Sequence, residues 1–481
     1  MKILTKSKYM IGLESKALLW RVVNEPEKTP NPDFILQDRF DEGALVESYA
    51  RKYFGEGVDL SNLEFEENLE MTKKHLELED TVFEAGFLEN RCFARADVIS
   101  PNEDGFDLFE VKSSTSTKKE HVEDLAFQKF VIESKGYKVK RCFLIHLNKN
   151  YYMKGKLDLK ELFVRVDLTE EVEKVLDVKE RVHEMLNIID LEKRPEFDVL
   201  EVANSKHENE FVDEFLKSLP KGNVFELYSI GKAKAVELYK KGIVEMKDLP
   251  ADFKLNSKQL VQVKSQRETQ VNKDKIEKWK DEFEEPLIYL DFETFTNPIP
   301  LFEGTKPYMH IPFQYSIHIE SDKGLIHKEF LYEKEDDPRR AFITNLLNDL
   351  PKKGSIIVYY KTFEVSRLKE LAKEFPELKE EIKKVILRVK DLRDPFSNFW
   401  YHNKRQKGSN SIKNVLPIFS DESYKDLEVS DGRAAMIIYK NNRGKLSEIQ
   451  RKDLLEYCKL DTMAMVIILR ELKKLVSTSE T

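Results

Sequence analysis

Two acidic residues stand close together in the segment LIYLDFETF (residues 287–295), and their spacing suits metal chemistry. Asp291 and Glu293 end an apolar run typical of a strand, in which residues two apart point to the same face. Two acids on one face repel each other unless a cation lies between them. Because carboxylate oxygens are the ligands that Mg²⁺ and Mn²⁺ prefer, the spacing predicts a divalent-metal site.

Three further side chains complete a set of four carboxylates and one phenol. Glu364 stands where an apolar strand pattern gives way to a helical one. Tyr457 and Asp461 are four residues apart in an expected C-terminal helix, so they share one face of it. Asp391 and Asp394, in the segment VKDLRDPF, are alternatives for the third acidic ligand, and we expect them to lie in a loop.

This set resembles the DEDD exonuclease superfamily, in the branch that carries a tyrosine, which has an RNase H-like fold. The resemblance implies a 3′-to-5′ exonuclease with two divalent ions about 3.5–4 Å apart, which activate a water molecule and stabilise the leaving oxygen. It implies that Tyr457 orients this water. The ligands that it implies are Asp291, Glu293, Glu364 and Asp461. The family has Asp at the position of Glu364, and usually Asn three residues earlier, where this chain has Lys361.

A second group of charged residues lies in the segment ADVISPNEDGFDLFEVK (residues 96–112). Two strand patterns flank the turn-forming residues SPNEDG, which predicts a hairpin with Asp97 on its first strand. Glu110 and Lys112 share one face of the second strand. Such a set can hold a metal ion, while the ammonium group orients or deprotonates the attacking water.

The hairpin and its flanking helices resemble the RecB-like branch of the PD-(D/E)XK nucleases. Glu47, on the expected helix before the hairpin, stands where that branch often has a metal-binding His or Glu, and Gln128, on the helix after it, matches the family's Gln. The family's Gln-x3-Tyr pattern would require Tyr at the position of Ile132. Some relatives carry an iron–sulfur cluster held by four cysteines, which three cysteines cannot build.

The segment between these two groups, residues 166–283, is charged and has helical patterns. Residues 225–250 resemble a helix-hairpin-helix, in which Gly231 forms the tight turn and Lys232 and Lys234 open the second helix. A helix N-terminus with nearby lysines favours a phosphate group. An ordinary glycine-containing helical turn fits this segment equally well.

The predicted fold class is α/β, with three domains in 481 residues at roughly 150 residues per domain. We expect a restriction-endonuclease-like domain (1–165), a helical region (166–283) and an RNase H-like domain (284–481). The first shows the order helix, hairpin, helix, strand. The last shows three meandering strands followed by alternating helices and strands, which indicates a mixed sheet.

Composition excludes some protein classes and leaves others open. Charged residues make up 35% of the chain, and the net charge of −8 gives no sign of a nucleic-acid partner. A metal-dependent nuclease can nevertheless be acidic, because its ions supply the local positive charge. The longest apolar run, residues 463–469, is far shorter than the roughly 20 residues of a membrane span. With no signal-peptide pattern and three widely spaced cysteines, we expect a cytoplasmic protein without disulfide bonds.

The order of the three regions resembles an uncharacterised bacterial family of RecB-type nucleases. We therefore expect a metal-dependent nuclease that acts on DNA or RNA, with a 3′-to-5′ exonuclease site in the C-terminal domain and a second, PD-(D/E)XK site. Two alternatives stay open. The chain could be a nucleic-acid-binding scaffold whose nuclease folds are inactive. Alternatively, one module could be active while the other only binds the nucleic acid.

Overall fold

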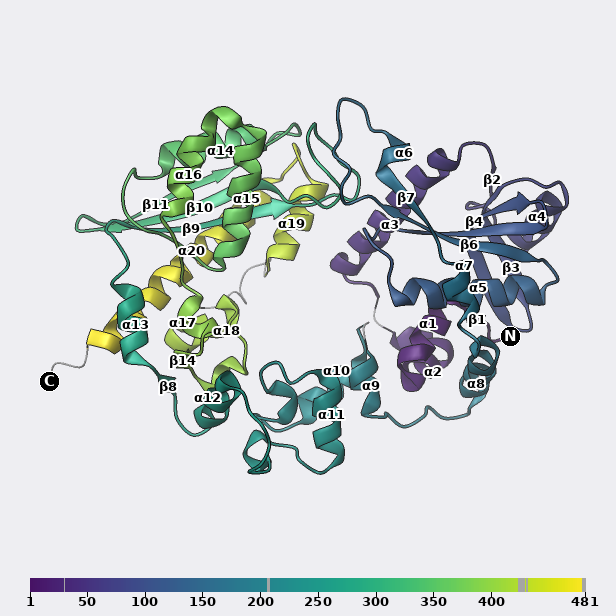
Figure 1. Cartoon of the computed structure of the whole chain (residues 1–481), viewed down its shortest axis with the longest axis horizontal. Helices are drawn as coiled ribbons and strands as arrows, with labels where there is room; N and C mark the ends of the chain where they lie inside the picture. Colours follow the sequence, from purple (N-terminus) through teal and green to yellow (C-terminus); the bar gives the residue numbers. More distant parts are fainter. Residues whose placement is uncertain (30, 206–207, 423–428, 430, 478–481) are drawn as a thin grey trace. The chain divides into compact units, whose positions relative to one another are not determined.

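The chain folds into two compact units (Figure 1). The computed structural model describes residues 1–481 apart from 30, 206–207, 423–428, 430 and 478–481. Unit 1 comprises Met1–Ser218 and Asn297–Met309, and unit 2 comprises Leu219–Thr296 and His310–Thr481. Each unit combines a sheet with helices, which confirms the α/β class. The expected helical region, 166–283, is divided between the units at Ser218.

A seven-stranded mixed sheet forms the centre of unit 1, with strand order β2-β3-β4-β5-β6-β7 and β1 paired to the start of β4. β3, β4 and β5 form an antiparallel meander, and β6 runs parallel to β5 because a helix, α5, connects them. The strands are β1 (Leu4–Thr5), β2 (Val58–Asp59), β3 (Val82–Glu89), β4 (Cys92–Asn102), β5 (Gly105–Lys112), β6 (Val139–Leu147) and β7 (Phe163–Asp167).

Helices cover both faces of this sheet. Successive residues of a strand point to opposite sides, and both sides of β5 and β6 carry apolar residues that need cover. Leu108 and Leu144 belong to the core that α1, α5 and α8 cover, whereas Phe109 and Phe143 belong to the core under α3. The helices are α1 (Lys6–Glu14), α2 (Lys16–Asn24), α3 (Phe34–Phe54), α4 (Phe65–Glu77), α5 (Lys119–Ser134), α6 (Leu159–Leu162), α7 (Thr169–Glu173), α8 (Val178–Asp190), α9 (Leu200–Asn204) and α10 (Glu210–Ser218), with the 3₁₀ turn η1 (Pro26–Lys28).

Residues 297–309 interrupt the second half of the chain and complete unit 1. Ile299 is buried in the core under α3. The backbone N–H of Met153 donates to the carbonyl of Thr305 at 2.8 Å, and the N–H of Gly304 donates to the carbonyl of Met153 at 2.9 Å. The segment after β9 (Leu287–Phe295) therefore belongs to a different unit from the strand itself.

Unit 2 has a five-stranded sheet with the order β11-β10-β9-β12-β13. β9, β10 and β11 are antiparallel neighbours, whereas β12 and β13 run parallel to β9. The other strands of this sheet are β10 (Ile311–Ser321), β11 (Gly324–Leu331), β12 (Ile356–Val358) and β13 (Val389–Asp391), and a separate two-stranded sheet pairs β8 (Gln270–Val271) with β14 (Tyr401–His402).

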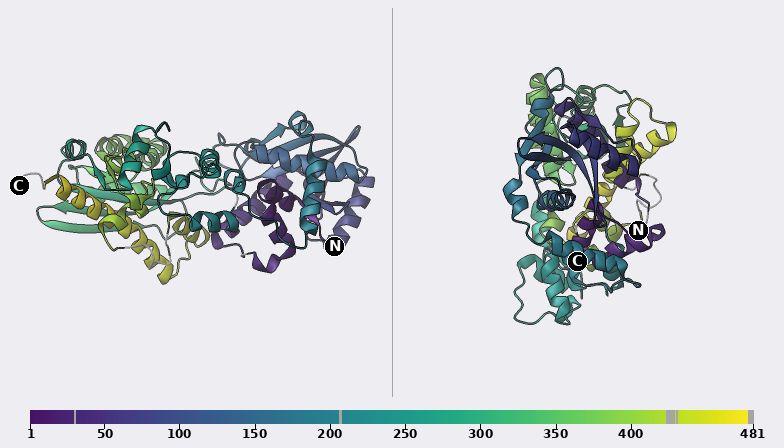
Figure 2. Two further views of the ribbon diagram at one scale, coloured as in Figure 1. Left: turned by 90° about the horizontal axis from the view of Figure 1, so that it is seen from below. Right: turned by 90° about the vertical axis from the view of Figure 1, so that its right-hand side faces the viewer.

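The large sheet of unit 2 lies between two helical layers. Ile288, Leu290 and Phe292 of β9 belong to a core shared with α14, α15 and α16, while α20 packs against β9 and β10 from the other face (Figure 2). The helices are α11 (Lys232–Lys240), α12 (Ser257–Ser265), α13 (Lys273–Lys280), α14 (Arg339–Asp349), α15 (Lys361–Glu374), α16 (Lys379–Leu387), α17 (Asp394–Ser397), α18 (Ile412–Phe419), α19 (Gly432–Asn441) and α20 (Glu448–Ser477), with the 3₁₀ turns η2 (Val224–Glu226), η3 (Met246–Asp248), η4 (Pro376–Leu378) and η5 (Lys404–Gln406).

The expectation that Asp391 and Asp394 lie in a loop was wrong. Asp391 ends β13, and Asp394 begins α17. The Asp391 carboxylate accepts the backbone N–H groups of Tyr360 (3.1 Å) and Lys361 (2.9 Å) at the start of α15. A three-residue strand is too short for its alternation to be recognised in the sequence. Asp391 therefore serves as a helix cap for α15.

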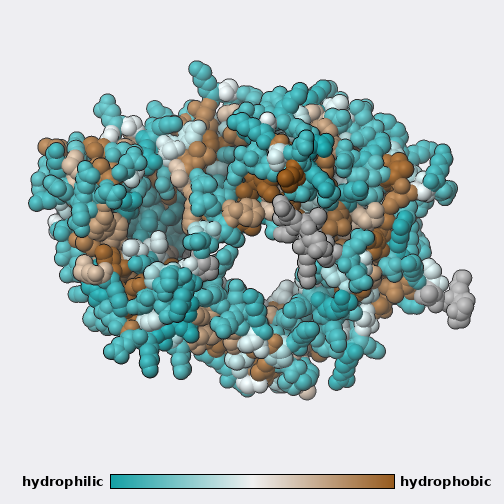
Figure 3. Space-filling view, turned by 180° about the vertical axis from the view of Figure 1, so that it is seen from behind, coloured by the Kyte–Doolittle hydropathy of each residue, from teal (hydrophilic) through white to brown (hydrophobic). Residues whose placement is uncertain are grey.

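The surface is mainly hydrophilic on the face drawn in Figure 3, where apolar side chains form small scattered groups. This agrees with the 35% of charged residues. Within the described ranges, no helix has both the length and the apolar character that crossing a membrane requires.

Candidate functional site

The carboxylates of β9 point away from the apolar core of unit 2. Ile288, Leu290 and Phe292 fill that core, so the alternating residues Asp291 and Glu293 lie on the opposite face, which α20 covers. The contact is direct, since the thiol of Cys458 in α20 lies 3.6 Å from Oδ2 of Asp291. The sheet and α20 thus bring together residues that are more than 160 positions apart in the chain.

Five residues expected from the sequence line one cavity of about 210 Å³. They are Asp291 and Glu293 from β9, Glu364 from α15, and Tyr457 and Asp461 from α20. Carboxylate oxygens of the two β9 acids and Asp461 all lie within 4.8 Å of one another. Such a group of acidic oxygens is of the kind that holds Mg²⁺ or Mn²⁺.

Burial and mutual repulsion make these acids hard to ionise. Burial, followed by the charge of Asp461, raises the pKa of Asp291 to about 8, although the Cys458 thiol acts in the opposite direction. Burial and the charge of Asp291 also raise the pKa of Glu293 and of Glu364 well above their ordinary values. A divalent cation would favour the charged forms and so relieve this repulsion.

Glu364 offers an oxygen that the protein leaves unused. Its side chain is buried, and Oε2 has no hydrogen-bond partner among the described residues. Buried polar atoms in proteins are almost always paired, so an unpaired carboxylate oxygen facing other acids suits a cation. The exonucleases that the sequence resembles have the shorter Asp at this position, and here the buried Glu364 lines the cavity.

Lys413, which lines this cavity, and Gly432, which lies close to two of its side chains, were not predicted from the sequence. Lys413 of α18 lies with Nζ 5.7 Å from the centre of the Tyr457 ring, and its charge opposes the rise in the pKa of Glu293. A methyl group built on Gly432, the first residue of α19, would lie 3.4 Å from Oε2 of Glu293 and 3.7 Å from the Tyr457 hydroxyl oxygen. No sequence signal marks either residue, since Lys413 is one of 80 Lys and Arg residues.

The acids and lysine expected in the N-terminal region also come together, in unit 1. Glu110 of β5 is 0% exposed, and its Oε2 accepts from Nε2 of Gln128 at 2.6 Å. Lys112 donates to Oε1 of Glu110, and Asp97 Oδ2 accepts the N–H of Val111 at 2.6 Å. These bonds connect β4, β5 and α5 through buried polar groups.

Asp124 of α5 joins this cluster without having been predicted. Its Oδ1 accepts from Nε2 of Gln128 at 2.9 Å, and its Oδ2 accepts from Nζ of Lys112 at 2.9 Å. Asp124 precedes Gln128 by one helical turn, so its i,i+4 spacing was a signal that could have found it.

A second lysine, Lys6 of α1, enters the same cluster. Its Nζ lies 2.8 Å from Oε1 of Glu110, and 3.8 Å from both Oδ1 of Asp97 and Oδ1 of Asp124. Although burial works to lower it, the charges of Asp124, Glu110 and Asp97 hold the pKa of Lys6 well above its ordinary value. The cluster therefore contains three acids and two ammonium groups.

Glu47 lies near this cluster on α3. Burial, followed by the charge of Glu110, raises the pKa of Glu47 above its ordinary value. Burial, followed by the charge of Glu47, raises the pKa of Glu84 to about 7. The expected ligand Glu47 is thus close enough to interact electrostatically with the cluster.

The expected helix-hairpin-helix has only one full helix. Gly231 adopts φ +77° and precedes α11, which begins at Lys232, as the pattern predicts. The segment before the turn forms the three-residue η2 instead of a helix. Lys234 pairs with Glu237 at 2.8 Å on its own helix, which reduces its availability to a phosphate.

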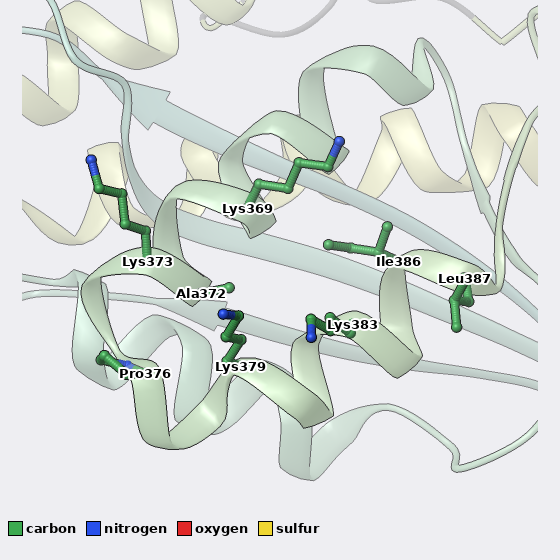
Figure 4. A pocket seen from close by; sticks show the side chains of 8 residues that line it. All are labelled: Lys369, Ala372, Lys373, Pro376, Lys379, Lys383, Ile386 and Leu387. Atoms are coloured by element: carbon green, nitrogen blue, oxygen red, sulfur yellow. The ribbon is translucent and has the colours of Figure 1, made fainter.

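Unit 2 contains two further cavities lined by basic side chains. One, of about 960 Å³, has seven: Lys221, Lys247, Lys264, Arg267, Lys404, Arg405 and Lys407. The other, of about 510 Å³ between α15 and α16, has Lys369, Lys373, Lys379 and Lys383 around Ala372 and Ile386 (Figure 4). Both lie apart from the cavity that holds the acids of β9, because they share no lining residue with it.

The chain is similar in sequence to a family of unknown function and to three uncharacterised proteins. A profile of the family described as "Domain of unknown function (DUF2779)" matches residues 288–411, which include Asp291, Glu293 and Glu364 but not Tyr457 or Asp461. Similar curated proteins are the uncharacterised proteins MG366 of Mycoplasma genitalium (27% identical over 231 residues), UU173 of Ureaplasma parvum (28% over 224) and the MG366 homolog of Mycoplasma pneumoniae (27% over 209). The matches cover 38–40% of this chain and 32–33%, or about a third, of each relative.

The raised pKa of Asp291 predicts that the metal-free protein loses stability as the pH rises. This carboxyl titrates near 3.8 when unfolded and near 8 when folded, so the folded chain holds the extra proton between these values. The stabilisation is complete below about pH 4 and is lost by about pH 8, at about 1.4 kcal/mol per pH unit for one proton. Thermal unfolding in EDTA at pH 5 and pH 8 measures this loss. Asp291→Asn should show a smaller change, and an equal change in both proteins would contradict the assignment.

Proposed function

We propose that unit 2 is a metal-dependent nuclease that hydrolyses phosphodiester bonds of DNA or RNA from the 3′ end. The observation that supports it most is the convergence of four carboxylates and a phenol on one cavity of about 210 Å³. The strand order β11-β10-β9-β12-β13, with α20 on one face, supports the likeness to the RNase H-like fold of the DEDD exonucleases. The family that matches residues 288–411 is described as having an unknown function, so the match does not indicate an activity.

The acids of this cavity fit the metal ions that the proposal requires. The three clustered carboxylates and the unpaired Oε2 of Glu364 supply oxygen ligands of the required type. When bound, two Mg²⁺ or Mn²⁺ ions would activate a water and stabilise the leaving oxygen. Because the pKa values of Asp291, Glu293 and Glu364 are raised, cation binding must release protons, and metal affinity should increase with pH.

Tyr457 and Lys413 would act on the substrate side of the same cavity. The hydroxyl of Tyr457 would accept or donate a hydrogen bond to the attacking water and so hold it in line with the scissile phosphorus. The ammonium of Lys413, near the Tyr457 ring, would attract a non-bridging phosphate oxygen. Neither role requires these groups to change their covalent structure.

The cavity of about 960 Å³ is the part of unit 2 that best fits the backbone of a substrate strand. Three glutamates also line it, but Lys221, Lys264, Arg267 and Lys404 are exposed and, among the residues described, have no acid within ion-pair distance. Several unpaired cations in one concave surface favour a polyanion. We therefore propose a nucleic-acid strand as its ligand.

Unit 1 is proposed to have the restriction-endonuclease-like fold of the RecB-like PD-(D/E)XK nucleases. The meander β3-β4-β5, followed by α5 and the parallel strand β6, supports this. Asp97, Glu110, Lys112 and Gln128 form its polar cluster, with Glu47 nearby. The alternative function is a nucleic-acid-binding scaffold in which one or both units do not cleave. A reducing cytoplasm is the proposed compartment, supported by the three buried, free cysteines.

Removing the acids of β9 should abolish hydrolysis. In Asp291→Asn combined with Glu293→Gln, the shape of the cavity is kept but two ligands lose their charge, so Mn²⁺-dependent release of mononucleotides from a 5′-labelled single strand should fall by at least about 10³-fold. The matched control is Glu380→Gln with Glu381→Gln, two exposed acids of α16 in the same unit. Equal rates in the double variant and the wild type would exclude unit 2 as the nuclease.

Tyr457→Phe should slow the reaction without removing metal. A positioned hydroxyl contributes to the rate by holding the water, and a loss of about 10²-fold in kcat is the size expected for such a group. KM and the Mn²⁺ affinity, measured by calorimetry, should stay unchanged, because the ring still fills the space beside Lys413. A change in Mn²⁺ affinity alone would assign Tyr457 to packing.

Charge reversal in the large basic cavity should weaken binding of a single strand. In the hydrolysis-deficient background, Lys264→Glu, Arg267→Glu and Lys404→Glu together should raise Kd, and should lower the slope of log Kd against log salt by about two, as expected for three lost phosphate contacts at about 0.7 each. Fluorescence anisotropy with a labelled oligonucleotide measures both quantities.

The lysine-lined cleft between α15 and α16 provides the control, because reversing three of its lysines changes the net charge of the same unit by the same amount (Figure 4). Lys369→Glu, Lys379→Glu and Lys383→Glu should leave the salt slope within about half a unit of the background protein. Equal losses in the two triple variants would mean that only net charge matters, and would remove the large cavity from the proposal.

A further inference from the structure

The acidic clusters of the two units differ in how many of their carboxylate oxygens accept hydrogen bonds from the protein. In unit 2, Oε2 of Glu364 is buried without a hydrogen-bond partner among the described residues. In unit 1, Oε1 of Glu110 accepts from both Lys6 and Lys112, and Oε2 accepts from Gln128. In unit 2, one carboxylate oxygen is thus left without a hydrogen bond among the described residues, whereas in unit 1 both oxygens of Glu110 are engaged.

The other two acids of the unit 1 cluster are engaged as well. Asp124 accepts from Gln128 at one oxygen and from Lys112 at the other. Asp97 accepts the N–H of Val111 at Oδ2, while its Oδ1 lies 3.8 Å from Nζ of Lys6. No carboxylate in this cluster retains a pair of unused oxygens with which to ligate an ion.

Lys6 is held in this position by the fold on both sides of it. Leu4, two residues earlier, is fully buried and pairs with Cys92 of β4. Thr5 caps α1 by accepting the N–H of Lys8, and Tyr9, one turn after Lys6, stacks on Phe127 of α5 at 4.6 Å. The backbone of Lys6 is thus anchored by buried contacts, so its side chain extends from a defined point.

The position of Lys6 does not suit an additional divalent ion. Ligand oxygens lie about 2.0–2.6 Å from Mg²⁺ or Ca²⁺, so an ion ligated by Oε1 of Glu110 would occupy nearly the same space as an ammonium at 2.8 Å from that oxygen. The two positive charges would also repel each other strongly at such a distance in a buried site.

We propose that Lys6 is the resident cation of the unit 1 cluster and takes the place of a divalent metal ion. Unit 1 then holds no metal ion at Asp97 and Glu110 while Lys6 is in position, and the same acids form a latent metal site that opens when the ammonium is removed. This proposal does not depend on the activity proposed for unit 2. It implies that hydrolysis by the chain comes from a single site and that unit 1 has a different role.

The test is Mn²⁺ binding by the full chain, measured by calorimetry and by the electron paramagnetic resonance signal of free Mn²⁺. Asp291→Asn and Glu293→Gln remove two candidate metal ligands from unit 2, so that any Mn²⁺ bound can be assigned to unit 1. This background protein, with Lys6 intact, should bind no Mn²⁺ in the micromolar range. Adding Lys6→Ala should create one Mn²⁺ site per chain, with an affinity at least about 100-fold higher, because a like charge has been removed from the site.

Two further variants identify the ligands and the cause. Adding Glu110→Gln to Lys6→Ala should abolish the new Mn²⁺ site. Lys16→Ala, which removes an exposed lysine paired with Glu184 at the surface of the same unit, should create no site. In EDTA the Lys6→Ala protein should melt at a lower temperature than the background, because three acids then share one ammonium, and Mn²⁺ should restore the melting temperature.

Two results would overturn the proposal. The first is Glu110-dependent Mn²⁺ binding by the background protein, a measurement that needs no change at Lys6. The second is a folded Lys6→Ala or Lys6→Gln variant that binds no Mn²⁺, which would show that the cluster is a structural ion-pair network and not a latent metal site. Neither result bears on whether the intact acids of unit 2 support hydrolysis.

Discussion

Repulsion between buried carboxylates is the constraint on which both polar clusters of this protein depend. An ionised acid in a protein interior is stable only when it is paired with a positive charge and hydrogen-bonded. Unit 1 meets this requirement for Glu110 with its own side chains, Lys6 and Lys112, although burial and the charge of Glu110 raise the pKa values of Asp97 and Asp124. In unit 2 the pKa values of Asp291 and Glu293 are raised, and one oxygen of Glu364 is unpaired among the described residues, which suits the external cation that we propose.

The two scaffolds produce these clusters in a similar way. In unit 2, β9 alternates between apolar residues that enter the core and acids that face the other side, as Phe292 and Glu293 do. In unit 1, Glu110 instead shares its face of β5 with the core residue Leu108. A helix then adds polar groups to the same side. In unit 1 this helix directly follows β5 in the chain, whereas in unit 2 it lies far along the chain from β9. α5 contributes Asp124 and Gln128 in unit 1, and α20 contributes Tyr457 and Asp461 in unit 2. Each cluster therefore forms only after sheet and helix have packed together.

An acidic net charge is compatible with the nucleic-acid substrate that we propose, because the charges are unevenly distributed. Acidic side chains gather in the cavity of β9, while basic side chains outnumber acids in a separate cavity of unit 2. A net charge of −8 is the sum of these opposite regions and says little about either. The distribution of charge, and not its total, is relevant to the proposed function.

The sequence by itself determined which site residues share one face of a strand or of a helix. Strand alternation placed Asp291 and Glu293 on one face, and helical spacing did the same for Tyr457 and Asp461, because both depend only on backbone geometry over a few residues. Tertiary structure decided which groups neutralise them. Lys6 reaches Glu110 across 104 positions, and Lys413 reaches the ring of Tyr457 in the cavity of unit 2 through packing. The residues next to a lysine in the sequence do not show which acid it will pair with, and the chain has 80 Lys and Arg residues. The pairing is decided when distant elements pack together.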